Sequence, residues 1–206
     1  MPRVTRRSLL VVAPVAIVLA GLPARAAPQY DPGATDSEIK IGNIMPYSGP
    51  ASAYGRPIGK TEARFFAMIN EEDGINGRKI TFLSYDDRYS PPKTVEQARR
   101  LVESDQVLLI FSSLGTPTNT AIHKYMNQKK VPQLFVLTGA TKWRDPKHFP
   151  WTIGWQANYQ SEARIYATYI LEHPSGGKVG VLYQNDDYGK DYLKGVKDGL
   201  APTPVP

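Results

Sequence analysis

A run of small hydroxyl and amide side chains, SSLGTPTNTA at residues 112–121, is the stretch best suited to contact a ligand. It follows an apolar run, and its residue types fit a helix cap, a phosphate-binding loop, the loop of a nucleophile or a cradle for another ligand. Thr116 is a good helix N-cap, and Pro117 is a good first helical residue. The free N–H groups of that first turn and the Thr116 hydroxyl could then hold an anionic group such as a carboxylate.

The segment GRPIGKT at 55–61 ends like the phosphate-binding loop G-x-x-x-x-G-K-[ST], but it has one residue too few between its glycines. Tyr54 stands where the first glycine of that loop belongs, so successive N–H groups could not surround a phosphate. We therefore expect a turn and then a helix, with Lys60 in solvent. The chain also lacks the G-x-S-x-G elbow of serine hydrolases, which leaves an enzyme with little support.

Two acidic pairs, Asp86-Asp87 and Asp186-Asp187, follow predicted strands and could contribute to a metal site. Adjacent side chains usually diverge, however, and no further ligand stands at a suitable spacing, so loop turns or caps are the favoured interpretation. The absence of cysteine excludes thiolate catalysis and Cys-ligated zinc. We expect no metal and no other cofactor. The three histidines also lack metal-binding spacing: His123, His148 and His173.

The N-terminus has the pattern of a secretory signal peptide over residues 1–26. Three arginines precede an apolar run too short to span a membrane, and Ala24-Arg25-Ala26 provides a cleavage site. TRRSLL also resembles a twin-arginine signal. Cleavage would remove four arginines and no acidic residue, so the formal net charge would fall from +6 to +2. We therefore expect a periplasmic protein with no nucleic-acid partner.

After a polar lead-in at 27–37, apolar stretches of strand length alternate with amphipathic stretches of helix length. This βαβαβαβ order predicts an α/β protein with a doubly wound, mostly parallel sheet over residues 38–155. The loops at 112–116 and 138–143 follow neighbouring strands, where ligands bind in such sheets. The expected strands are 38–44, 77–87, 107–113 and 133–139, and the expected helices are 57–71, 92–104 and a third from Pro117.

A second α/β unit is expected to begin near Trp155 and to run over residues 156–200. Its elements are a helix at 158–172, a strand at 178–184 and a helix at 188–199. APTPVP at 201–206 cannot continue a helix and is expected to be a disordered tail. One strand and two helices cannot bury a doubly wound core, so this second lobe would be incomplete.

These segments resemble, in order and spacing, the periplasmic solute-binding proteins of branched-chain amino acid ABC transporters, the type I, leucine/isoleucine/valine-binding-like family. The resemblance covers nearly all of residues 38–200. It is carried by IKIGNIMPYSGPASAYG, MINEEDGINGRKI, SYDDRYSPPKTVEQARRLVES, the SSLGTPTNT loop, the TGAT loop and VLYQNDDYGKDY. It implies two α/β lobes that close on a ligand.

The resemblance also implies which residues contact the ligand. Tyr54 matches a tyrosine that faces the cleft. Thr116 matches a hydroxyl residue that binds the ligand carboxylate beside the backbone of Leu114 and Gly115. The second loop and the second lobe are expected to add three more contacts: Gly139, Thr141 and Tyr188.

Branched-chain or other aliphatic amino acids are the default ligands that the resemblance implies, with an ABC permease in the inner membrane as partner and a monomeric state. Trp143 could stack on a ring, which keeps aromatic acids or short amides as an alternative, although lobe packing is the favoured role. A third reading is an enzyme using Lys60, Asp86 or Asp186, such as a hydrolase or a nucleotide-dependent protein.

The resemblance ends near Leu200, whereas such proteins usually need well over 300 residues. The later acidic residue that meets the ligand ammonium in amino-acid binders falls in the missing part. We therefore expect a C-terminally truncated chain that binds its ligand weakly or not at all, with a nonfunctional remnant as the alternative.

Overall fold

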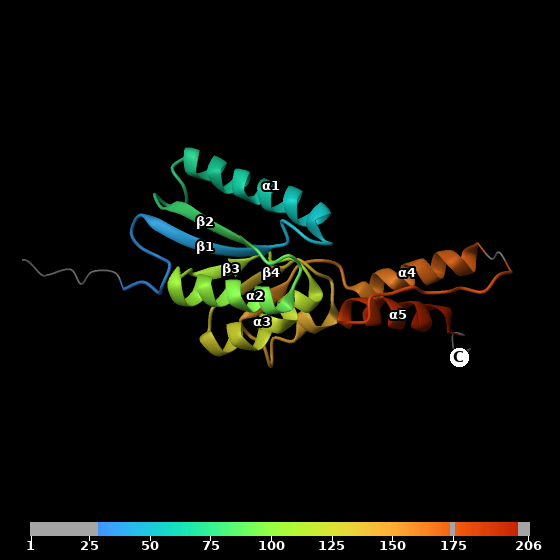
Figure 1. Cartoon of the computed structure of the whole chain (residues 1–206). Coiled ribbons are helices and arrows are strands. Elements are labelled where there is room, and N and C mark those ends of the chain that lie inside the picture. The colour runs from blue at the N-terminus through green and yellow to red at the C-terminus, as the bar shows by residue number, and fades with distance from the viewer. Residues whose placement is uncertain (1–28, 174–175, 202–206) are drawn as a thin grey trace, which may run out of the picture.

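The computed structural model describes residues 29–173 and 176–201. The predicted signal peptide, and the predicted tail beyond Ala201, lie outside the described residues. Five parallel strands form one sheet in the order β2-β1-β3-β4-β5, which confirms the predicted α/β fold (Figure 1). The strands are β1 (Glu38–Met45), β2 (Lys79–Asp86), β3 (Leu109–Phe111), β4 (Gln133–Val136) and β5 (Thr152–Gly154).

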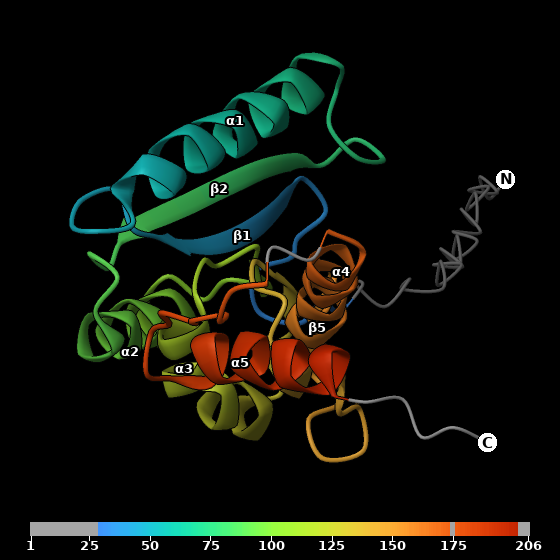
Figure 2. The ribbon, with the colours of Figure 1, turned by 90° about the vertical axis from the view of Figure 1, so that its right-hand side faces the viewer.

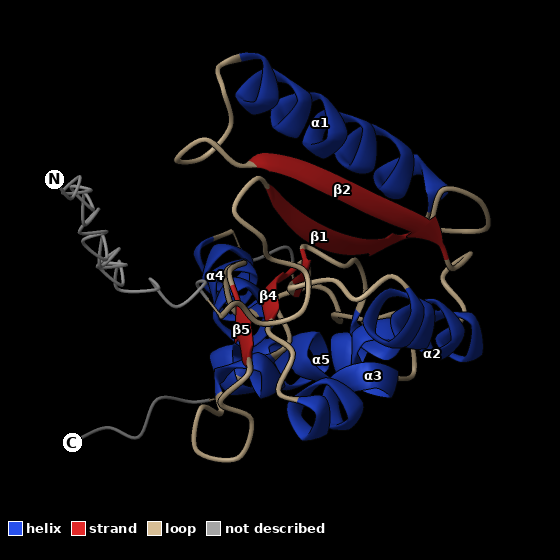
Figure 3. Ribbon diagram, turned by 90° about the vertical axis from the view of Figure 1, so that its left-hand side faces the viewer, coloured by secondary structure: helices blue, strands red, loops and turns tan. Residues whose placement is uncertain are grey.

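Helices cover both faces of the sheet, as the apolar parallel strands require. Helix α1 (Ser52–Glu71) lies on one face, where Phe66 packs with Ile41 and Ile80. Helices α2 (Pro91–Arg99), continued by a π-helical turn η1 (Arg100–Ser104), and α3 (Thr116–Lys129) lie on the other face (Figure 3). The core between them and the sheet is built from Ile44, Ala98, Leu101, Val107, Ile110, Ile122 and Met126.

Helix α1 begins at Ser52, five residues before the predicted start, and it contains Pro57. Gly55 lies in the added first part of the helix and approaches the loop after β1 so closely that a Cβ there would lie 2.2 Å from the Pro46 carbonyl oxygen. This close approach holds the first turn of the helix against the sheet. As a result Tyr54 lies on a helix rather than in a turn.

The structure corrects two strand assignments. Residues 152–154, expected in a loop, form β5, because the Gln133 N–H donates to the Trp151 carbonyl at 2.7 Å and Asn127 fixes the Trp151 N–H. Residues 178–184, expected as a strand, are extended but pair with no strand of the described chain. Leu182 is fully exposed there. The backbone N–H and C=O groups of a strand pair with those of a neighbouring strand. Residues 178–184 have no such neighbour within the described ranges.

Helices α4 (Tyr159–Glu172) and α5 (Asp187–Leu200) pack side by side and extend away from the sheet (Figures 1 and 2). Small residues allow the contact, since a Cβ on Gly195 would lie 2.6 Å from the Ala163 Cβ. Asp186 caps α5 by accepting from the Gly189 N–H at 3.2 Å, which confirms the cap interpretation of this aspartate. Within residues 29–173 and 176–201, no helix is both long and apolar enough to cross a membrane.

Candidate functional site

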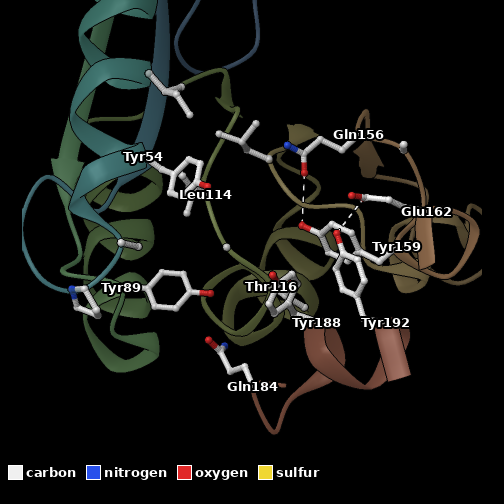
Figure 4. Close-up of a pocket in the computed structure, with 16 residues that line it drawn as sticks. Tyr54, Tyr89, Leu114, Thr116, Gln156, Tyr159, Glu162, Gln184, Tyr188 and Tyr192 are labelled. Carbon is white, nitrogen blue, oxygen red and sulfur yellow. Dashed lines mark hydrogen bonds between the residues drawn. The ribbon is translucent and has the colours of Figure 1, made fainter. Parts of the chain in front are cut away.

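A cleft of about 690 Å³ lies between the strand ends of the sheet and the pair α4 and α5. Its size falls within the range of small-molecule sites. Figure 4 shows Tyr54 and Tyr89 on one side, with Tyr159, Tyr192 and Glu162 on the other. Its lining residues are Pro50, Ala51, Tyr54, Ile58, Tyr89, Leu114, Gly115, Thr116, Leu137, Gln156, Ala157, Tyr159, Glu162, Gln184, Tyr188 and Tyr192.

The loop after β3 forms the floor of the cleft and is held by the helix that follows it. Gly115 has a φ of 106°, a conformation that favours glycine, and a Cβ there would lie 2.5 Å from the Tyr89 ring. The Asn119 amide donates to the Gly115 carbonyl at 2.8 Å, and the Thr118 hydroxyl donates to the Leu114 carbonyl at 2.7 Å. The Leu114 and Gly115 N–H groups donate to the Ile44 and Leu137 carbonyls, each at 3.3 Å. The backbone donors that this region can offer to the cleft are therefore those of the first turn of α3.

Thr116 begins α3 but does not cap it, which corrects the predicted N-cap. Gly115 occupies the N-cap position and no side chain makes a capping bond. The Thr116 hydroxyl instead lies 2.5 Å from the Thr138 hydroxyl, and Thr116 is almost fully buried. The two threonines join the ends of β3 and β4, so a hydroxyl pair lies beside the first turn of α3.

The wall on the sheet side is fixed by the first acidic pair. Asp86 accepts from the Ser48 hydroxyl at 2.5 Å, which anchors the loop that leads into α1. Asp87 is buried and accepts from the Tyr89 N–H at 2.9 Å and from the Thr94 hydroxyl at 2.7 Å. These bonds confirm the turn interpretation of the pair, and they position Tyr89 in the cleft. Burial raises the pKa of Tyr89.

The opposite wall is a cluster of three tyrosines around a carboxylate. The rings of Tyr159 and Tyr192 stack at a centroid distance of 4.9 Å, and Tyr188 lies perpendicular to both, 5.1 Å from the first and 5.3 Å from the second. Glu162, in the first turn of α4, accepts from the Tyr192 hydroxyl at 2.8 Å. Burial, followed by this hydrogen bond, raises the pKa of Tyr192.

Five of the seven predicted site residues line the cleft together: Tyr54, Leu114, Gly115, Thr116 and Tyr188. The other two lie nearby but outside its lining. A Cβ on Gly139 would lie 2.1 Å from the Ala157 carbonyl oxygen, so this glycine allows the chain to pass toward α4. The Thr141 N–H donates to Asp191 at 2.7 Å. Both residues thus connect the sheet to the pair α4 and α5, and their ligand contacts stay predictions.

Trp143 is buried in a cluster with Val136 and Ala140, and its ring meets His123 edge-on at 5.0 Å. This confirms the packing role that the sequence favours for Trp143. The aromatic character of the cleft comes instead from five tyrosines, of which Tyr54 and Tyr188 were predicted as site residues and Tyr89, Tyr159 and Tyr192 were not. Tyr89 stands two residues after Asp87 of the first acidic pair, which was a usable signal, whereas Tyr159 and Tyr192 meet only through the packing of α4 on α5. The other unselected polar lining residues are Gln156, Glu162 and Gln184.

The described residues contain no group of three or more side chains arranged to hold a metal ion. The acidic pairs are occupied by the loop and cap hydrogen bonds described above, and by the Lys142–Asp187 ion pair at 2.9 Å. The polar groups that remain available in the cleft are hydrogen-bond donors and acceptors suited to a small organic solute.

A parallel sheet with a ligand-sized cleft beyond the carboxyl ends of its strands, walled by a second pair of helices, defines a small-molecule-binding α/β protein. Comparison with known sequences identifies the family to which the chain belongs. The sequence model of the family described as "Periplasmic binding protein" matches residues 38–202. The chain belongs to this family, whose members are solute-binding proteins.

Curated relatives include the leucine-specific-binding protein of Salmonella typhimurium, 26% identical over 187 residues, which cover 89% of this chain and 48% of the relative. The Leu/Ile/Val-binding protein homolog 3 of Brucella melitensis is 27% identical over 168 residues, with 80% and 44% covered. The chain therefore spans about half the length of the curated relatives it matches.

Solved structures share the fold. A substrate-binding periplasmic protein from Ralstonia solanacearum aligns with a TM-score of 0.72 at 26% identity, covering 79% of this chain and 46% of that one. A possible leucine/isoleucine/valine-binding protein from Rhodopirellula baltica aligns with a TM-score of 0.73 at 24% identity, with 80% and 44% covered. Both have the fold of type I periplasmic binding proteins, which this chain shares.

Proposed function

We propose that this chain is the extracytoplasmic substrate-binding component of an ABC importer and holds a small carboxylate-bearing solute in the cleft. The observation that carries this proposal is the loop of Leu114, Gly115 and Thr116, which brings the N-terminus of α3 to the cleft floor. A helix N-terminus favours an anionic group through its free N–H groups and its dipole. The hydroxyl pair of Thr116 and Thr138 adds a further donor.

Leucine, isoleucine and valine are the first solutes to test, because the curated relatives are named as binding proteins for these amino acids. Aromatic acids or short amides are the second candidates, since five tyrosines line the cleft. The bound solute would pass to a permease in the inner membrane, with the monomeric chain exported to the periplasm and no chemistry of its own. A type I protein of this kind closes its lobes on the ligand.

The test is calorimetry of the chain without residues 1–26 against these amino acids and against aromatic acids. Because described residues line the cleft from both sides, we now expect saturable binding rather than the weak binding expected from the sequence. We expect Thr116→Val to weaken it by about 1 to 3 kcal/mol because a buried hydrogen bond to a carboxylate is lost. Thr168→Val is the matched control, because Thr168 is exposed on α4 and donates to the Arg164 carbonyl. Equal affinity of the Thr116 variant and the wild type would remove this residue from the carboxylate site.

A further inference from the structure

The extended segment at 178–184, KVGVLYQ, has an unpaired backbone and exposed apolar side chains. It runs back from the end of α4 to the start of α5 (Figure 1). Within the described ranges, no group accepts a hydrogen bond from its backbone N–H groups. Its apolar side chains are all exposed: Val179, Val181, Leu182 and Tyr183. An exposed edge of this kind is a template for pairing with another strand.

The segment lacks the features that protect exposed edges in other proteins. It contains no proline, and its single charge, Lys178, is at its first residue. Protected edges carry prolines, or charged side chains along the strand. The adjoining helix α4 adds two exposed apolar side chains one turn apart, Ile165 and Tyr169. Contiguous apolar surface marks sites of interaction with other proteins.

The sequence of the segment is complementary to itself about Val181. Two copies related by a two-fold axis pair with antiparallel strands, and each contact is repeated in reverse. With the axis at Val181, this residue faces its own copy, and Val179 faces Tyr183 of the second copy. These alternate residues share one face of the paired strands. Pairs of β-branched and aromatic side chains across two strands stabilise the pairing.

The charges and the length of the segment agree with this register. Lys178 faces the uncharged Gln184 of the second copy, and Asp186 follows two residues later on the same side. No like charges meet, and opposite charges lie diagonally across the pair at both ends. The Asp186 N–H donates to the Gln184 carbonyl at 2.8 Å, so the unpaired backbone ends there and Val181 is its midpoint.

We propose that residues 178–184 pair in antiparallel fashion with the same segment of a second copy of this chain, about a two-fold axis at Val181. This inference goes beyond the proposed function and does not depend on it, because Gln184 is the single residue of the segment that lines the cleft. The monomer that the resemblance implies is then the dissociated form, and copies pair after export.

Sedimentation velocity of the chain without residues 1–26, over a series of concentrations, tests the pairing. We expect a reversible dimer. Val181→Lys and Val181→Glu each place like charges opposite one another on the axis, so each should raise the dissociation constant roughly tenfold or more. A mixture of the two variants places opposite charges on the axis. It should therefore form a heterodimer about as tightly as the wild type dimerises.

Ile75→Lys is the matched control, because Ile75 is also an exposed apolar residue but lies in the turn before β2. It should dimerise like the wild type. Recovery of the heterodimer in the mixture also shows that both Val181 variants are folded. Cross-linking gives a second measurement, because the chain has no cysteine. Mild oxidation should link two copies of Val181→Cys much faster than two copies of Ile75→Cys.

The result for the wild type decides whether the segment pairs with itself. A wild type that stays monomeric up to millimolar concentration would overturn the self-pairing and make a different polypeptide the occupant of this segment. Growth into larger aggregates would overturn the closed two-fold pair. A dimer that persists in both Val181 variants, or equal cross-linking at residues 75 and 181, would place the contact elsewhere. Absence of the heterodimer in the mixture would overturn the register.

Discussion

At the scale of single residues, buried polar side chains fix the edge of the sheet that faces the cleft. Asn43 is buried in β1, and its amide donates to Glu62 of α1 at 3.2 Å and to the Phe111 carbonyl at 2.9 Å. Its carbonyl accepts from the Ser84 hydroxyl at 2.5 Å. One amide thus connects α1 to three adjacent strands. None of these partners can be read from local sequence, because the residues meet only across the sheet.

Glu62 should make stability depend on pH. Burial raises the pKa of Glu62 to about 7 from its ordinary value of 4.5. The folded state therefore holds this proton more tightly, so the contribution of the group to stability is full below pH 4.5 and is lost as the pH rises through 7. Glu62→Gln cannot ionise, so its stability relative to the wild type should increase from pH 5 to pH 8, on the order of 1 kcal/mol after solvent screening.

Urea unfolding of both proteins at the two pH values measures this difference. Glu71→Gln is the matched control, because Glu71 ends the same helix and is exposed. A constant difference between Glu62→Gln and the wild type at both pH values would show that Glu62 has no raised pKa in the folded protein.

At the scale of elements, strand prediction succeeded where apolar runs are long and failed where pairing decides. The predicted strands at 38–44, 77–87, 107–113 and 133–139 correspond to β1, β2, β3 and β4. β5 is three residues long in a segment rich in proline and aromatics, so its sequence carries no period to detect. The segment 178–184 has the composition of a strand, but a strand forms only beside a neighbour.

Asp191 should hold α5 against the loop after β4. Its two carboxylate oxygens accept from the Thr141 N–H and from the Gln160 amide, each at 2.7 Å. Asp191→Ala leaves both donors without this partner, so we expect a loss of about 1 to 3 kcal/mol in the stability of this contact. Hydrogen exchange should show faster exchange of the Thr141 amide and of amides along α5.

Asp198→Ala is the control on the same helix. Asp198 pairs with Lys194 at 2.6 Å in an exposed position, where an ion pair contributes little. Similar exchange changes in the two variants would contradict the special role given to Asp191.

At the scale of the whole molecule, the sequence predicted where the cleft lies better than it predicted which residues line it. The alternating order of strands and helices predicted that the 112–116 loop lies at the carboxyl ends of the strands. Five of the seven predicted residues line one cleft there. Of the three tyrosines on the opposite wall, Tyr188 was predicted and Tyr159 and Tyr192 were not, because these two come from different helices and their contact depends on the close approach of Gly195 to Ala163.

Binding of a small carboxylate-bearing solute at the start of α3 can be observed residue by residue with NMR. L-Leucine is titrated into the isotope-labelled chain without residues 1–26 while amide shifts are followed. We expect saturating shifts at the Gly115 and Thr116 amides together with Tyr188, because these residues line the cleft. No saturating change at Gly115 and Thr116, or changes confined to Thr141 and Lys142 outside the cleft, would contradict binding at the start of α3.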